Sequence, residues 1–166
     1  IGLYDEYNHG AMDRREFLGK LSLLAGSVAA TDALLHLLES KNAQAAVVPQ
    51  YDSRLNTNYI TYPGASGDMR AYWARPKGDA KLPAVIVVHE NRGLNPHIED
   101  IARRISLEGY LVIAPDALSP LGGTPSDRDQ ARTLIGKLDA KVNINNFVAA
   151  VKYLKTHPQS TGKVGV

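Results

Sequence analysis

Cysteine is absent from this chain of 166 residues, so disulfides, thiolate metal sites and a cysteine nucleophile are excluded within it. A strong charge of either sign is lacking too. The formal net charge is +2, and no basic stripe with interleaved aromatic residues occurs, which argues against nucleic-acid binding. With 44% hydrophobic and 22% charged residues, the composition is that of an ordinary globular protein, and the length corresponds to about one domain.

Two catalytic sequence patterns are also missing. No Gly-x-Ser-x-Gly occurs, because the nearest candidate, Gly64-Ala65-Ser66-Gly67, has the wrong spacing and lies in a predicted turn. His89-Glu90 does not start an HExxH zinc motif, since residue 93 is Gly93. We therefore expect that no nucleophilic triad can be assembled from these residues alone. The sequence gives no reason to expect a metal or an organic cofactor.

The first 50 residues differ in pattern from the rest. Arg14-Arg15 is followed by Phe17-Leu18, by a weakly apolar run over residues 21–38, and then by Ala43-Gln44-Ala45. This order resembles a bacterial twin-arginine export leader with cleavage after Ala45. Apolar residues also recur at roughly helical spacing in this region, so an amphipathic helical arm is the alternative.

Charged and polar residues interrupt that apolar run at Lys20, Asp32 and His36, which argues against a membrane-spanning helix. We divide the chain into an N-terminal helical arm or export signal, residues 1–50, and a globular region, residues 51–166. If the Arg14-Arg15 leader is functional, the protein is exported to the periplasm; otherwise it is cytoplasmic.

The globular region has the pattern of a mixed α/β domain, with a mostly parallel sheet and flanking helices. Strands are predicted where short apolar runs end in turn-forming residues, over 58–62, 69–74, 84–89, 111–114 and 163–166. Helices are predicted over 96–108, after a cap at Ser126 to residue 138, and after a cap at Asn143 to residue 157. Gly109 is placed where a left-handed residue ends the first of these helices.

Each long helix is predicted to bury one apolar face. The face of the helix over 96–108 comprises Ile98, Ile101, Ala102 and Ile105. The face of the helix over 143–157 comprises Ile144, Phe147, Val148, Val151 and Leu154.

Polar residues follow two of the buried strands, as His89-Glu90-Asn91 and as Pro115-Asp116. In open α/β sheets the functional crevice lies at the carboxyl ends of the strands. Residues 84–89 form the third predicted strand, after which α/β-hydrolases place one backbone N–H of the oxyanion hole; Asn91 is our candidate for that donor.

Simpler interpretations of these residues stay open. Glu90 can be a solvated carboxylate paired with Arg92 or Arg103, and Asp116 can hold the loop after its strand by hydrogen bonds. Arg92 can bind an acidic substrate or sit in a salt bridge. His97 is most simply an exposed residue in the first turn of its helix.

Four blocks of sequence, in order, resemble the dienelactone hydrolase family of α/β-hydrolases. They are PAVIVVHENRGLN over 83–95, IEDIARR over 98–104, EGY over 108–110 and APD over 114–116, and the resemblance extends over roughly 58–166. It implies an α/β-hydrolase fold and the opening of lactones or the cleavage of esters, with a Cys or Ser nucleophile, an Asp and a His. Small-molecule esters or lactones would be the substrates.

The resemblance also implies roles for individual residues. Glu90 matches the glutamate that contacts the resting nucleophile and helps to control its ionisation. Asn91 matches the residue whose backbone N–H contributes to the oxyanion hole. His89 and Arg92 depart from the best-known members, and we regard them as candidate substrate-binding residues, so the substrate can differ from a dienelactone.

In the family, a strand like 163–166 runs directly into the nucleophile elbow, and the triad Asp and His follow further on. The resemblance therefore implies that this chain is the N-terminal half of the fold and that the nucleophile and triad lie beyond Val166. We expect the chain alone to be inactive and to require its C-terminal half, or self-association as a homo-oligomer. The alternative is a non-catalytic family member that acts as a binding module. The sequence leaves open the physiological substrate and the choice of Cys or Ser as nucleophile.

Overall fold

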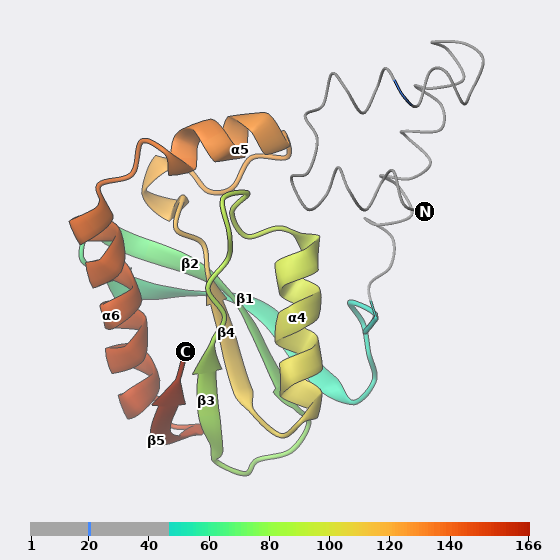
Figure 1. Ribbon diagram of the computed structural model, residues 1–166. Helices are drawn as coiled ribbons and strands as arrows, with labels where there is room; N and C mark the ends of the chain where they lie inside the picture. Colours follow the sequence, from blue (N-terminus) through green and yellow to red (C-terminus); the bar gives the residue numbers. More distant parts are fainter. Residues whose placement is uncertain (1–19, 21–46) are drawn as a thin grey trace. The chain divides into compact units, whose positions relative to one another are not determined.

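The computed structural model describes Lys20 and residues 47–166 of the chain (Figure 1). Apart from Lys20, these residues belong to the second of two units into which the chain divides, Ala46–Val166. Apart from Lys20 and residues 47–50, the predicted leader or helical arm lies outside the described residues, and the division at residue 50 stays a prediction. No helix in the described part of the chain is long and apolar enough to cross a membrane.

The described domain contains a five-stranded sheet with the order β1-β2-β4-β3-β5. Its strands are β1 (Leu55–Gly64), β2 (Gly67–Pro76), β3 (Leu82–Ile86), β4 (Leu111–Pro115) and β5 (Ser160–Gly165). The first three in this order pair antiparallel, whereas β4, β3 and β5 run parallel. The predicted α/β fold with flanking helices is confirmed, and the sheet itself is mixed, because two of its four strand pairings are antiparallel and two are parallel.

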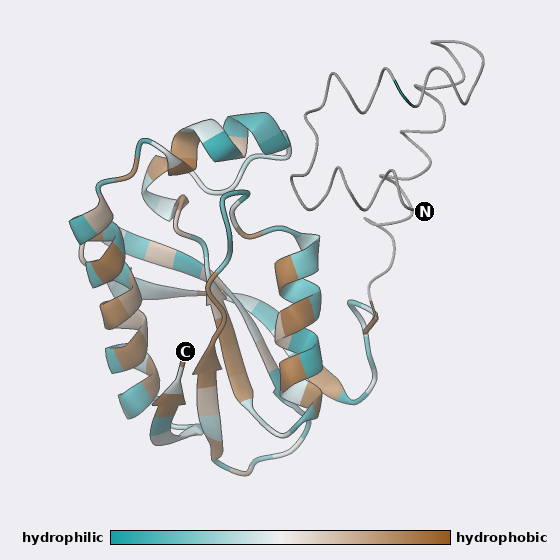
Figure 2. Cartoon of the chain, in the orientation of Figure 1, coloured by the Kyte–Doolittle hydropathy of each residue, from teal (hydrophilic) through white to brown (hydrophobic). Residues whose placement is uncertain are grey.

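Helices cover both faces of the sheet (Figure 1). They are α4 (Pro96–Leu107), the short 3-10 helix η1 (Ser119–Leu121), α5 (Arg128–Ile135) and α6 (Ala140–Thr156). Alternate residues of β4 face opposite layers, since Val112 and Ala114 pack with residues of α4 while Leu111 and Ile113 pack with residues of α6. All of β4 is buried, and Figure 2 shows it as a hydrophobic strand between the two helices.

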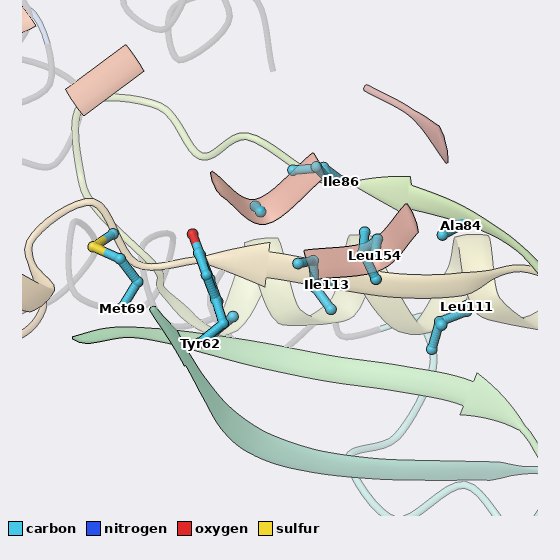
Figure 3. Close-up of a cluster of buried hydrophobic side chains, with 9 residues drawn as sticks. Tyr62, Met69, Ala84, Ile86, Leu111, Ile113 and Leu154 are labelled. Atoms are coloured by element: carbon cyan, nitrogen blue, oxygen red, sulfur yellow. The ribbon is translucent and has the colours of Figure 1, made fainter. Parts of the chain in front are cut away.

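The larger part of the core lies between the sheet and α6. Buried side chains from β1, β2, β3, β4 and α6 meet here. Figure 3 shows them: Tyr62, Met69, Ala84, Ile86, Leu111, Ile113 and Leu154. Each of them is at most 2% exposed. Burying apolar area on this scale is the main favourable contribution to folding.

Helix α4 begins and ends as its sequence predicts. The Asn95 side chain accepts hydrogen bonds from the backbone N–H groups of His97 and Ile98, and Pro96 occupies the first turn. Gly109 follows the helix with a φ of +93°, a conformation that favours glycine. Of the predicted apolar face, Ile98 and Ala102 are buried, and Ile101 and Ile105 pack beside them.

The other two helix starts were predicted wrongly. Asp127, not Ser126, caps α5, because its Oδ1 accepts the Gln130 N–H at 2.7 Å. Asp139, not Asn143, caps α6, because its Oδ1 accepts the Val142 N–H at 2.8 Å. Asn143 lies inside the helix. Each aspartate accepts the backbone N–H of the residue three positions later, as Ser and Asn caps also do. The error therefore lay in choosing between two capping residues close together in the sequence.

The predicted apolar face of α6 is only partly buried. Leu154 is fully buried, and Phe147 and Val151 pack partly against the core. Ile144 and Val148 are instead 62% and 44% exposed. The helix buries Asn146 on the sheet side, where its amide binds the β1–β2 turn.

Strands β3 and β5 are shifted from the predicted ranges. Strand β3 ends at Ile86, although the Val87 N–H still donates to the Ile113 carbonyl at 2.9 Å. The three residues before Asn91 therefore belong to a loop. Strand β5 starts at Ser160 and lies at the edge of the described sheet.

Candidate active site

The carboxyl ends of β3 and β4 meet at one edge of the sheet because the two strands are adjacent and parallel. The loop after β3 and the loop after β4 therefore lie side by side, as the sequence predicts for a functional crevice. The structure brings His89, Glu90, Asn91, Arg92 and Asp116 together in these two loops.

A four-residue turn from Glu90 to Gly93 projects from this edge. The Gly93 N–H donates to the Glu90 carbonyl at 3.4 Å, and Gly93 has a φ of +69°. Glu90, Asn91 and Arg92 are all exposed, whereas the flanking His89 and Leu94 are 9% and 8% exposed. The turn thus presents three functional groups to solvent on a buried base.

Within residues 47–166, the Asn91 N–H has no hydrogen-bond acceptor, and the side chains of Glu90 and Arg92 form no ion pair. Arg103 does not pair with Glu90, contrary to one simpler interpretation. Its guanidinium instead approaches Glu99 and Asp100 at 4.0 and 3.8 Å. His97 is exposed in the first turn of α4, as predicted.

His89 joins the two loops through its ring. Its Nε2 lies 3.0 Å from the Ala117 backbone nitrogen, and its Nδ1 lies 2.7 Å from the Glu90 carbonyl oxygen. A backbone N–H can only donate, so Nε2 is the acceptor and Nδ1 carries the proton. Both ring nitrogens are therefore bound to backbone, which leaves neither for a ligand. We therefore propose no substrate-binding role for His89.

Asp116 organises the loop after β4, as the simpler interpretation of this residue predicts. Its side chain is 1% exposed and accepts three hydrogen bonds. They come from the Leu118 N–H at 3.0 Å, the Thr124 N–H at 2.8 Å and the Thr124 hydroxyl at 2.7 Å. Buried carboxylates are normally satisfied in this way.

Thr124 is a residue that sequence reasoning missed. Its Oγ1 accepts the Leu94 N–H at 2.9 Å while donating to Asp116. A side chain at Gly93 would overlap Thr124, so this glycine is needed for close approach as well as for its positive φ. The only sequence signal was the glycine pair before Thr124, which indicates a tight loop but not its partner.

The arrangement offers a carboxylate, a backbone N–H donor and a guanidinium at one sheet edge. An exposed N–H of this kind can stabilise an oxyanion, and a carboxylate can influence the ionisation of a neighbouring nucleophile. Among the described residues, no group of three or more His, Asp or Glu side chains could hold a metal ion.

Comparison with known families matches residues 69–166 to the dienelactone hydrolase family. Residues 1–26 match a second family, described as YqhI-like.

Curated relatives carry hydrolase names. YghX of Escherichia coli K12, named as a hydrolase fragment, is 47% identical over 110 residues, which are 64% of this chain and 94% of YghX. A Salmonella typhi protein named as a carboxymethylenebutenolidase is 40% identical over 112 residues, 67% of this chain and 41% of that protein.

A solved structure extends the likeness to the fold. A Klebsiella pneumoniae protein, named as a dienelactone hydrolase, superimposes with a TM-score of 0.56 and 28% identity, over 67% of this chain and 49% of that one. The chain thus spans about half the length of this neighbour and less of the Salmonella relative. On the family match and the identity to YghX, the chain belongs to the dienelactone hydrolase family.

Proposed function

We propose that this chain is the N-terminal half of an ester or lactone hydrolase of the dienelactone hydrolase type, and that it supplies Glu90 and the Asn91 N–H to the active site. The observation that carries the proposal is the Glu90–Gly93 turn, whose first two residues are exposed at the carboxyl end of β3. The Asn91 N–H has no acceptor within residues 47–166, so it is available to a substrate oxygen.

The proposed chemistry is acyl transfer. A Cys or Ser nucleophile, contributed by the C-terminal half, attacks the ester or lactone carbonyl carbon. The carbonyl oxygen gains negative charge and accepts a hydrogen bond from the Asn91 N–H. Glu90 faces the resting nucleophile and influences its ionisation. When the intermediate collapses, the bond between the carbonyl carbon and the alcohol oxygen breaks, and that oxygen takes up the proton that the nucleophile lost; it leaves as an alcohol, or stays attached as the free hydroxyl of an opened lactone. Water then attacks the acyl–enzyme carbonyl, which releases the carboxylic acid and restores the nucleophile. Arg92 is exposed beside them and suits a substrate that carries a carboxylate.

One edge of the described sheet offers a surface for association. Strand β5 lies at the edge of the described sheet, and Val166 after it is 82% exposed. On the helix that packs beside β5, Ile144 and Val148 are 62% and 44% exposed. An unpaired strand next to exposed apolar side chains favours association. We propose that the C-terminal half of a hydrolase covers this edge, with self-association as the outcome in its absence.

The catalytic proposal is tested with a hybrid in which this chain continues, after Val166, into the remaining residues of the Salmonella relative. We expect the hybrid to hydrolyse p-nitrophenyl acetate and the 166-residue chain not to do so. Asn91→Pro removes the N–H from a turn position that accommodates proline, and should lower kcat by a factor of about 10²–10³. Asn91→Ala keeps the N–H and serves as the matched control.

Glu90→Gln in the same hybrid should change the pH dependence of kcat/KM, because it removes a negative charge beside the nucleophile. An inactive hybrid, or equal kcat values for Asn91→Pro and Asn91→Ala, would contradict the proposal. If the hybrid is folded, inactive and not labelled by thiol- or serine-directed reagents, the chain is better described as a binding module.

Association is tested by size-exclusion chromatography of the 166-residue chain with and without the separately produced C-terminal segment of the relative. We expect oligomers or aggregates alone and a one-to-one complex with the segment. A well-folded monomer that ignores the segment would refute this part of the proposal.

A further inference from the structure

The Glu90–Gly93 turn is held at both of its ends by the neighbouring loop. At one end, His89 donates from Nδ1 to the Glu90 carbonyl and accepts the Ala117 N–H at Nε2. At the other end, the Leu94 N–H donates to Thr124 Oγ1. The four residues between these points carry the Glu90 carboxylate and the Asn91 N–H.

Both points of attachment return to one short segment after β4. Ala117 follows Asp116 directly, and Thr124 is held by two hydrogen bonds to the Asp116 carboxylate. Because Asp116 is 1% exposed and at the end of a fully buried strand, this segment is fixed by the core. A turn bound at both ends to a fixed support loses few conformations when a substrate binds.

We infer that His89 and Thr124 are positioning residues, which act through the turn to hold the Glu90 carboxylate and the Asn91 N–H in place before substrate binds. Neither side chain needs to touch the substrate, since both are committed to backbone groups. Their catalytic role rests on the proposed function. The attachment of both ends of the turn to the neighbouring loop, which we call pinning, does not. Placing an oxyanion donor in advance is what makes such a donor effective.

The pinning is tested on the 166-residue chain itself by amide hydrogen exchange. In the unchanged protein, the Leu94 and Ala117 amides should exchange at least about tenfold more slowly than the Asn91 amide. This measurement needs no substitution, so a variant that fails to fold does not weaken it. Equal exchange of the three amides would overturn the inference.

Substitution at Thr124 then separates pinning from general stability. Thr124→Val removes the hydroxyl and should raise exchange of the Leu94 amide about tenfold, while amides of α6 stay unchanged. Thr124→Ser keeps the hydroxyl and should restore protection. The matched control is Thr133→Val on α5, whose hydroxyl binds only the Asp129 carbonyl.

In the hybrid enzyme, Thr124→Val should lower kcat about tenfold with a smaller change in KM, and Thr124→Ser should recover kcat. An equal loss in both variants, or an effect on KM alone, would overturn the positioning role. An inactive unchanged hybrid would instead reject the proposed function, and the exchange measurements would still decide whether the turn is pinned.

Discussion

Arg103 is a buried cation through which α4 holds the start of the described domain. Its guanidinium donates to the Val48 carbonyl at 2.9 Å and to the Tyr72 hydroxyl at 3.0 Å, and it lies 3.8 Å from the Asp100 carboxylate. Asp100 in turn accepts the Val48 N–H at 2.8 Å. The two charged side chains thus bind both backbone groups of Val48, and each is 3% exposed.

Replacing Arg103 by methionine keeps an extended side chain but leaves the Asp100 carboxylate buried without a cation. Removing one partner of a buried ion pair costs about 3–5 kcal/mol, mostly because of the charge left behind. We therefore expect Arg103→Met to lower the free energy of unfolding by about that amount. Arg104→Met, on the exposed side of the same helix, is the control and should change it by less than about 0.5 kcal/mol.

The assay is urea unfolding of the 166-residue chain, at one fixed protein concentration because self-association would add to stability. Asp100→Asn removes the carboxylate charge that Arg103→Met leaves without a cation. The double variant should therefore lose less free energy of unfolding than the sum of the two single variants. Strictly additive costs, or a loss below about 1 kcal/mol for Arg103→Met, would refute the argument that the stranded charge dominates.

Three further predictions concern other parts of the fold. Asn146→Ala removes the acceptor of two N–H groups in the β1–β2 turn and should cost about 1–3 kcal/mol in urea unfolding, whereas the exposed Asn145→Ala should cost little; equal costs would contradict this. Burial and the nearby Arg75 lower the pKa of His157 below its ordinary 6.5, so the unfolded chain binds the proton more tightly and stability should fall as pH drops below about 6.5; an unaltered slope in His157→Gln would argue against this. Burial and a hydrogen bond to Glu99 raise the pKa of Tyr59 from 10.0 to about 12, so stability should fall as pH rises between these values. Urea unfolding at several pH values measures this fall; Tyr59→Phe should reduce it, and an equal fall in the variant would contradict the assignment.

The positions of the strands along the chain could be predicted because they follow from local patterns. Buried parallel strands such as β4 are continuous apolar runs, and a helix such as α4 carries both a cap and a terminal glycine. The start of α6 could not be placed because Asp139 and Asn143 are both capping residues. Only the packing of the helix on the sheet selects between them. Likewise, helical spacing placed Ile144 and Val148 on a buried face, although the described residues leave both exposed.

At the candidate site, the order of strands and helices predicted a crevice at the two strand ends. It did not predict the contacts between the loops that follow them. His89 was predicted as a substrate-binding residue because it departs from the best-known members of the family that the sequence resembles. Its partner, Ala117, is 28 residues away and contributes a backbone N–H, which no side-chain pattern reveals. Thr124 is similarly paired with a backbone N–H 30 residues away. Contacts to backbone across such separations depend on the pairing of β3 with β4, which composition and spacing do not encode.

The same hydrogen bonds show that the Glu90–Gly93 turn does not depend on β5 for its position. Every hydrogen bond that holds the Glu90–Gly93 turn joins two residues within 89–124, which lie in the loops after β3 and β4. The exposed edge at β5 lies on the far side of β3 from β4, and none of these hydrogen bonds crosses it. A C-terminal half that pairs with β5 would therefore bring its nucleophile to a turn already in place. If so, amide exchange at Leu94 and Ala117 should be the same in the chain and in the hybrid, whereas that of the β5 amides should slow in the hybrid.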